Sequence, residues 1–217
     1  MKYKLEFIEY IIGKNYSEYT IKAYKKDLDA FSLYLDKKKI KEVDYKFLRN
    51  YLVILHEKKY SKKTIARNIS TLKSYFKYLK KMNYIKTNPM SLIKTPKLDK
   101  KLPKFLYYDD VEKILSLPDK KNPLGLRDAL ILELLYSTGI RVSELINIRL
   151  RDVDLPGRKI LILGKGNKER IVLFGTKAYN LIIEYLEKVD NKSEHLIVNR
   201  YGNKISDRGV RKIIDKI

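Results

Sequence analysis

Two short segments of the sequence carry side chains that could act on a phosphate group. The first is Thr138-Gly139-Ile140-Arg141-Val142-Ser143-Glu144-Leu145, which follows a long apolar run. Arg141 stands where a new helix should begin, and the backbone N–H groups and dipole of a helix favour an anion at that place. Its planar guanidinium could grip two phosphate oxygens. The spacing equally allows Arg141 to form a structural ion pair with Glu144 or Asp128.

The second segment is Gly164-Lys165-Gly166-Asn167-Lys168, which lies between two β-prone runs. Its glycines predict a turn, and Lys165 at that turn could reach a bound ligand. The spacing differs from the GxxxxGK[ST] pattern of a phosphate-binding loop, so nucleotide hydrolysis has no support. By itself, a lysine in a turn is more commonly a solvated surface residue.

The charge of the chain favours a polyanionic partner. The 48 Lys and Arg residues, set against 26 Asp and Glu residues, give a formal net charge of +22, and such a field attracts nucleic acid. Because AT-rich coding sequence alone can raise the lysine content, the position of the charge says more than its amount. Every charged side chain between Glu57 and Asp99 is basic. Nucleic acid is therefore the first candidate partner.

Residues 61–82 predict an amphipathic helix that carries much of this charge. Ser61 is a suitable N-cap, and the core face consists of apolar side chains at helical spacing: Ile65, Ile69, Leu72, Phe76 and Leu79. The opposite face holds only cations and hydroxyl groups, with no acid one turn away to pair with them. The side chains that we expect to bind DNA on this helix are Lys62, Lys63, Thr64, Arg67, Ser70, Ser74, Lys77 and Lys81. The alternative is an ordinary solvated face of a lysine-rich protein.

Periodicity and turn residues divide the chain into two domains and a linker. The first domain should contain helices over residues 2–13, 17–36, 44–58 and 61–82. A Pro- and Lys-bearing stretch cannot continue a helix, and it sets the boundaries at 1–94, 95–104 and 105–217. The second domain should contain helices over 109–117, 126–137, 143–148 and 177–188 and from 206, with a β-hairpin of strands 159–163 and 170–174. A left-handed Gly139 should end the helix over 126–137.

Several classes of protein are disfavoured by what the sequence lacks. It contains no cysteine, which removes disulfide and thiol chemistry and fits a reducing compartment. No apolar run has the length of a signal-peptide core or a membrane span, so we expect a cytoplasmic protein without membrane contact. The two histidines, His56 and His195, have no partner at metal-ligand spacing and are interpreted as structural or surface residues. We expect no metal and no small-molecule cofactor.

Taken together, these strings resemble the tyrosine recombinase (phage integrase) family, in particular its Xer-like branch. In the first domain, the matching positions are Ser17, Thr20, Tyr24, Leu28, Phe31, Leu35, Ser61, Thr64, Arg67, Leu72, Phe76 and Leu79, then Asn88-Pro89, Pro96-Lys97 and Leu102-Pro103. In the second, the segments around Arg141 and Lys165 resemble the first catalytic box and the β-hairpin lysine segment. The resemblance covers essentially the whole chain.

The resemblance implies a fold and a chemistry. The fold is mainly α, with an N-terminal four-helix SAM-like DNA-binding domain and an incomplete α+β recombinase catalytic domain that holds a small β-hairpin sheet. In the family, a tyrosine attacks the scissile phosphate, arginines stabilise the transition state and a lysine protonates the leaving oxygen, without metal or ATP. By this resemblance, Arg141 is the first catalytic arginine, Lys165 the general acid and Glu144 the acidic residue that supports Arg141.

The sequence also departs from the family pattern. The His-x-x-Arg box and the nucleophilic tyrosine have no match in the printed residues. We therefore expect this chain to bind a double-stranded recombination site without cutting it. On the DNA, its partner should be a second copy of itself or a paralogous recombinase. Two alternatives remain open: a naturally short DNA-binding accessory or inhibitor of recombination, and a basic RNA-binding module. The sequence leaves open the target site, and whether the role is chromosome dimer resolution or integration of a mobile element.

Overall fold

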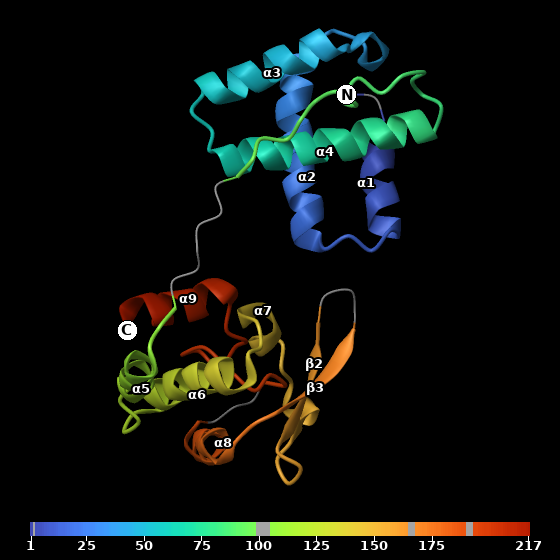
Figure 1. Cartoon of the computed structure of the whole chain (residues 1–217). Helices are drawn as coiled ribbons and strands as arrows, with labels where there is room; N and C mark the ends of the chain where they lie inside the picture. The colour runs from blue at the N-terminus through green and yellow to red at the C-terminus, as the bar shows by residue number, and fades with distance from the viewer. Residues whose placement is uncertain (2, 99–104, 165–167, 190–192) are drawn as a thin grey trace. The chain divides into compact units, whose positions relative to one another are not determined.

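The chain folds into two compact units, Met1–Leu102 and Pro103–Ile217, each with its own core. The computed structural model describes residues 1, 3–98, 105–164, 168–189 and 193–217, and Figure 1 shows the elements. Residues 99–104 of the expected linker lie outside the described residues. In the part of the chain that the structure describes, no helix has both the length and the apolar character needed to cross a membrane.

The first unit is helical, as predicted. Its four helices begin and end within two residues of the expected positions: α1 (Lys4–Gly13), α2 (Glu18–Leu35), α3 (Tyr45–Glu57) and α4 (Lys62–Lys81), with a short 3-10 helix at Ile40–Glu42. Side chains before three of them accept a backbone N–H from the first turn: Ser17 before α2, Asp44 before α3 and Ser61 before α4. These local caps explain why the sequence alone located the helix starts.

Helix α4 is central to the first unit. It crosses α1 and α2 and contacts α3 (Figure 1), and the apolar face predicted for it is buried. Phe31 of α2 meets Phe76 of α4 and Tyr51 of α3 edge-on, with ring centroids 6.1 and 5.1 Å apart. Such aromatic pairs add to the burial of area. Because this packing fixes α4 relative to α2 and α3, the polar face of α4 has a fixed orientation in the first unit.

The second unit surrounds helix α6. Its helices are α5 (Tyr108–Ser116), α6 (Pro123–Thr138), α7 (Val142–Leu145), a 3-10 helix at Leu150–Asp152, α8 (Thr176–Lys188) and α9 (Asp207–Lys216). Leu126, Leu130 and Leu134 of α6 are completely buried, and α6 packs against α8 (Figure 1). The sequence predicted a helix buried in the middle of the domain, because its side chains are apolar on nearly every side. The structure confirms this prediction.

A three-stranded antiparallel sheet lies beside these helices. Strands β2 (Lys159–Leu163) and β3 (Glu169–Leu173) confirm the predicted hairpin, with Ile162 opposite Arg170. The sequence did not predict β1 (Val153–Asp154), which pairs with β2. The turn residues 165–167, and with them Lys165, lie outside the described residues.

Gly139 ends α6 and sets the start of the next helix. Its φ of 61° is left-handed, as predicted, and its N–H donates to the Leu135 carbonyl oxygen at 3.2 Å. Two residues later, Arg141 is the N-cap of α7. A residue other than glycine would be strained at this φ.

We expect Gly139→Ala to lower the free energy of unfolding by about 1 kcal/mol because the left-handed region disfavours a Cβ. Gly139→Asn should cost less, since Asn adopts this conformation more readily. Nothing lies within 4 Å of a Cβ built on Gly139, so the loss reports backbone strain rather than crowding. Thermal unfolding of the three proteins measures it, and equal stability of the alanine variant and the unaltered chain would contradict the assignment.

Candidate functional site

Glu144 is the centre of the polar site in the second unit. Its side chain is only 4% exposed, and each of its two carboxylate oxygens accepts two hydrogen bonds. Oε1 accepts from Nη1 of Arg141 at 2.9 Å and from Nη1 of Arg170 at 2.9 Å. Oε2 accepts from the Arg141 backbone N–H at 2.8 Å and from Nη2 of Arg170 at 2.7 Å. A buried carboxylate that makes four charge-assisted or backbone hydrogen bonds is fully satisfied.

Two local structures bring these groups together. At the start of α7, Glu144 is three residues after the N-cap Arg141 and closes a capping box with its backbone. Arg170 comes from β3, opposite Ile162 of β2. At the end of β2, a Cβ on Gly164 would lie 3.2 Å from Nη1 of Arg170 and 3.6 Å from Oε1 of Glu144. Glycine at this position therefore lets the hairpin approach the ion pair closely.

The arginines keep Glu144 ionised. The pKa of Glu144 is lowered to about 2, mainly by hydrogen bonding from Arg170 and also by the backbone and side chain of Arg141, while burial acts in the opposite direction. One carboxylate faces two guanidinium groups, so the cluster carries an excess positive charge. The Arg141 side chain is 72% exposed and the Arg170 side chain 40% exposed. This excess charge faces solvent, where it suits an anion such as a phosphate.

The structure shows the ion pair that the sequence allowed for Arg141, and phosphate binding by this residue stays a prediction. Arg141 does pair with Glu144, whereas Asp128 pairs with Arg127 at 2.7 Å instead. Only Nη1 of the Arg141 guanidinium is used in that pair. Structural pairing therefore leaves most of this side chain open to a ligand.

Arg170 was not among the site residues predicted from the sequence. It lies in the same segment as Lys165, but 26 residues from Glu144, and no local spacing predicts the pairing. The available signal was the apolar sequence around Glu144, which indicates that this carboxylate is buried. A buried Glu requires more donors than one arginine supplies. Lys165 itself lies outside the described residues, so its role as general acid stays a prediction.

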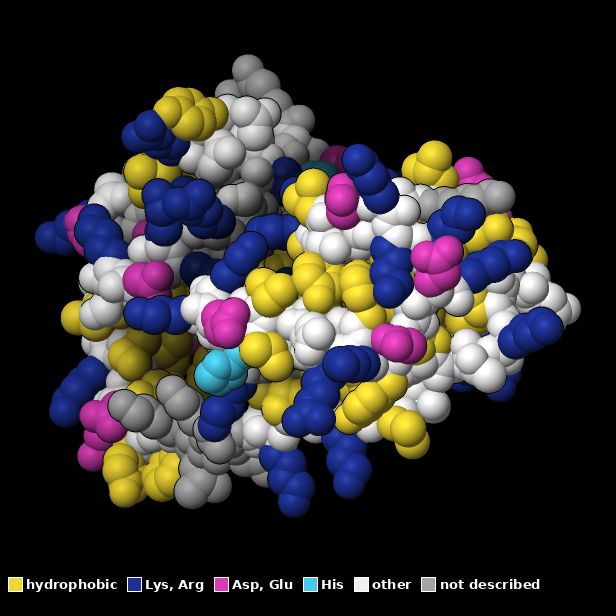
Figure 2. All heavy atoms as spheres, turned by 90° about the horizontal axis from the view of Figure 1, so that it is seen from above, with side chains coloured by type: hydrophobic (Ala, Val, Ile, Leu, Met, Phe, Trp, Pro, Cys, Tyr) yellow, Lys and Arg dark blue, Asp and Glu magenta, His cyan; other side chains and the backbone are white. Residues whose placement is uncertain are grey.

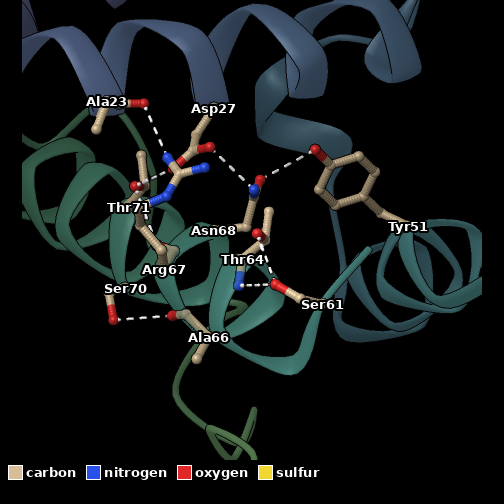
Figure 3. A network of polar contacts seen from close by, with 10 residues as sticks. All are labelled: Ala23, Asp27, Tyr51, Ser61, Thr64, Ala66, Arg67, Asn68, Ser70 and Thr71. Atoms are coloured by element: carbon tan, nitrogen blue, oxygen red, sulfur yellow. Dashed lines mark hydrogen bonds and ion pairs between the residues drawn. The ribbon is translucent and has the colours of Figure 1, made fainter. Parts of the chain in front are cut away.

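The α4 face, defined by the residues predicted there to bind DNA, is more varied than the sequence suggested. Lys63, Lys77 and Lys81 are exposed, and Lys81 lies 5.3 Å from the ring centroid of Tyr10. Arg67, in contrast, pairs with Asp27 of α2, Nη1 to Oδ2 at 2.5 Å (Figure 3). As the sequence indicated, no acid lies one turn away on α4, but Arg67 finds an acidic partner on another helix, which helical spacing does not predict.

The hydroxyl groups of the α4 face are bound within the first unit. Thr64 Oγ1 lies 3.0 Å from Oγ of the N-cap Ser61, and Ser70 donates to the Ala66 carbonyl oxygen at 3.0 Å. Ser74 hydrogen-bonds Tyr24, whose pKa is raised by burial. Lys62 is exposed at the first position of α4. On the side of the molecule drawn in Figure 2, Lys and Arg side chains outnumber acidic ones and lie among apolar and uncharged groups.

The histidines have the structural surroundings expected of them. The backbone of His195 pairs with that of Arg149, and burial lowers the pKa of the His195 ring. His56 lies in the last turn of α3. Within the described ranges, no three His, Asp or Glu side chains gather in a way that could hold a metal ion.

We expect Glu144→Gln to lower the free energy of unfolding at pH 7 by about 2 kcal/mol, because it removes charge-assisted hydrogen bonds. Since the pKa of Glu144 is held below its usual 4.5, its stabilisation is complete above that pH and disappears as the pH falls towards 2. The difference between the two proteins should therefore shrink across this window in thermal unfolding. Glu184→Gln, which removes a carboxylate from the exposed pair with Lys188, should cost at most about 0.5 kcal/mol. A difference that stays constant between pH 4.5 and pH 2 would contradict the role of the ionised carboxylate.

Comparison with protein families matches both units. A model of the phage integrase family matches residues 104–217, and a model of the phage integrase N-terminal SAM-like domain matches residues 5–83. The tyrosine recombinase XerC of Anoxybacillus flavithermus is 41% identical, over 97% of this chain and 74% of the relative. That of Oceanobacillus iheyensis is 40% identical, over 97% and 73%.

Solved structures have the same fold. A lambda integrase dimer bound to a COC′ core site aligns with a TM-score of 0.75 at 17% identity, over 97% of this chain and 77% of that chain, and at this identity it supports the fold alone. The XerH recombinase bound to its difH substrate aligns with a TM-score of 0.68 at 27% identity, over 94% and 63%. The predicted fold, mainly helical with an N-terminal SAM-like domain and a small sheet, is confirmed. The chain belongs to the phage integrase family, and tyrosine recombinases of the Xer type are among its relatives.

Proposed function

We propose that this chain supplies the DNA-binding and phosphate-gripping parts of a site-specific tyrosine recombinase. The observation that carries the proposal is the cluster in which buried Glu144 holds Arg141 and Arg170 and leaves excess positive charge in solvent. Arg141 would stabilise the charge that develops on the oxygens of the scissile phosphate. Glu144 would hold Arg141 in place, and Lys165 would protonate the leaving oxygen.

The chemistry expected of the family proceeds through the protein's own side chains. A tyrosine hydroxyl attacks the phosphorus atom, the bond to the leaving 5′ oxygen breaks, and the phosphate remains linked to the protein until the reverse attack rejoins the strand. The bond energy is kept in the phosphotyrosine, so rejoining requires no cofactor. The nucleophile has no counterpart in family context among residues 1–217.

We propose the division of labour predicted from the sequence: residues 1–94 bind DNA, 95–104 link the domains, and 105–217 hold the catalytic side chains. The partner is double-stranded DNA in the cytoplasm, with a second recombinase subunit bound beside this one. The solved lambda integrase is a dimer on its core site and a tetramer on a Holliday junction. This supports DNA as the partner and a second recombinase subunit beside this one. The α4 face would contribute affinity that does not depend on sequence.

Replacing Lys63 and Lys77 together by alanine should weaken binding to every duplex by a similar factor. For every phosphate that the variant no longer neutralises, the slope of log K against log[salt] should become shallower by up to about 0.9. Fluorescence anisotropy at several salt concentrations, on two duplexes of unrelated sequence, measures both quantities. Lys188→Ala, on the other unit, removes one lysine from outside the α4 face, and we expect it to change neither quantity. Unchanged affinity and slope in the double variant would contradict the assignment of the α4 face.

The polypeptide of residues 1–217 should bind DNA without forming a covalent link, because no nucleophile is expected in it. We would first select tight-binding duplexes from a random pool and then test nicked versions of them for a product that survives denaturation. Arg141→Ala should weaken binding to the selected duplexes roughly tenfold, the effect of removing one charge-assisted hydrogen bond. A covalent product would contradict the assignment of the nucleophile. An Arg141→Ala variant that binds as tightly as the unaltered chain would argue against a phosphate at this arginine.

A further inference from the structure

Arg67 lies between α2 and α4, and among the described residues only one nitrogen atom of its guanidinium has a hydrogen-bond partner. Nη1 donates to Oδ2 of Asp27 at 2.5 Å and to the Ala23 carbonyl oxygen at 3.2 Å, both on α2 (Figure 3). Nη1 carries two hydrogens and makes two hydrogen bonds, so it has none to spare. The orientation of the guanidinium relative to α2 is thereby fixed.

The carboxylate that holds Arg67 is itself held from several sides. Asp27 is 2% exposed, and it also accepts from Nδ2 of Asn68 at 2.9 Å and from the Thr71 hydroxyl at 2.8 Å. Tyr51 of α3 donates to Oδ1 of Asn68 at 3.3 Å, which orients the amide (Figure 3). Burial raises the pKa of Asp27, while the contacts with Thr71 and Arg67 act in the opposite direction. Three helices thus fix the position of this carboxylate.

The remaining donors of Arg67 reach solvent. No group among the described residues accepts a hydrogen bond from its Nε or Nη2. Within the same part of the chain, no buried side-chain nitrogen or oxygen lacks a partner, so these two atoms must be accessible. The Arg67 side chain is 37% exposed. The N–H bonds of Nε and Nη2 are parallel on one edge of the guanidinium, which is the edge that binds two oxygens of one phosphate.

Exposed lysines lie close in sequence to the residues that hold Arg67 and to Arg67 itself. Lys22 and Lys26 of α2 are exposed near Ala23 and Asp27, and Lys63 of α4 is exposed one turn before Arg67. The next acid on α2, Asp29, is paired with Lys4 of α1. The lysines supply attraction for a phosphate, and Arg67 supplies fixed geometry.

We propose that Asp27 is a positioning residue for DNA binding: it holds the Nη1 side of Arg67 so that the Nε–Nη2 edge grips two oxygens of a single backbone phosphate of duplex DNA. This inference rests on the proposed function and specifies one contact of it. Arg67 loses its side-chain freedom on folding rather than on binding, which favours the complex. The charge of Asp27 acts in the opposite direction, because a carboxylate near a phosphate repels it.

These opposite signs make Asp27→Asn a sharp test. If Asp27 serves only the fold, removing a negative charge should leave duplex affinity unchanged or increase it. If Asp27 positions Arg67, affinity should fall roughly 5- to 10-fold and the salt slope should become shallower by up to about 0.9, although the protein gains positive charge. Asp29→Asn changes the same charge on the same helix and should bind as tightly as the unaltered chain or more tightly. Anisotropy titrations at several salt concentrations, with circular dichroism as a check of folding, separate the two cases.

Arg67→Lys keeps the test decisive if Asp27→Asn fails to fold. A lysine ammonium keeps the charge and can satisfy Asp27, but it has no second edge for a phosphate. We expect it to fold, to bind duplex several-fold more weakly and to give a shallower salt slope. Affinity and slope equal to those of the unaltered protein, in either Arg67→Lys or folded Asp27→Asn, would overturn the inference.

The same titrations distinguish this inference from the proposed function. Binding that depends on Lys63 and Lys77 but is unaffected by changes at Asp27 and Arg67 would overturn the positioning role alone. Absence of salt-dependent duplex binding by the unaltered chain would overturn the proposed function, and this inference with it.

Discussion

The buried carboxylate of Glu144 is the constraint on which the site of the second unit depends. An ionised carboxylate away from water is costly unless every oxygen is paired, so α7 and β3 must both deliver an arginine to it. The side chain of Arg170 and the close approach at Gly164 hold the hairpin against the helix start. The geometry of Arg141 is therefore a consequence of the same pairing that stabilises the fold.

The first unit uses the same physical arrangement with other elements. Asp27 is as deeply buried as Glu144, and each carboxylate holds an arginine through Nη1. In both cases the carboxylate is satisfied by more than the arginine: by Asn68 and Thr71 in one, and by Arg170 in the other. The arginine gives only part of its hydrogen-bonding capacity to the protein. Its remaining N–H groups stay in a defined direction without a further loss of side-chain freedom on binding.

The sequence predicted what depends on near neighbours and missed what depends on packing between distant segments. Helix starts at Ser17 and Ser61 and the helix end at Gly139 follow from one residue and the turn beside it, and the structure confirms them. The pairs Arg67–Asp27 and Arg170–Glu144 join residues 40 and 26 positions apart. No periodicity specifies such a partner, because it is set by the crossing of two helices or the register of two strands. The two-residue strand β1 was missed because so short a run has no alternation to detect.

Arginine and lysine therefore have different tasks in this chain. In the proposed function, the lysines of the α4 face, such as Lys63 and Lys77, attract DNA through a field that depends on their number and on salt, and an ammonium on a flexible stem serves this purpose at many positions. In the proposed function, Arg67 and Arg141 satisfy a buried carboxylate and an external phosphate at the same time, which requires several N–H groups in one rigid plane. A high lysine content can come from composition alone, but a buried acid that orients an arginine towards solvent requires a specific fold. The two carboxylates thus point to phosphate binding more specifically than the net charge of +22 does.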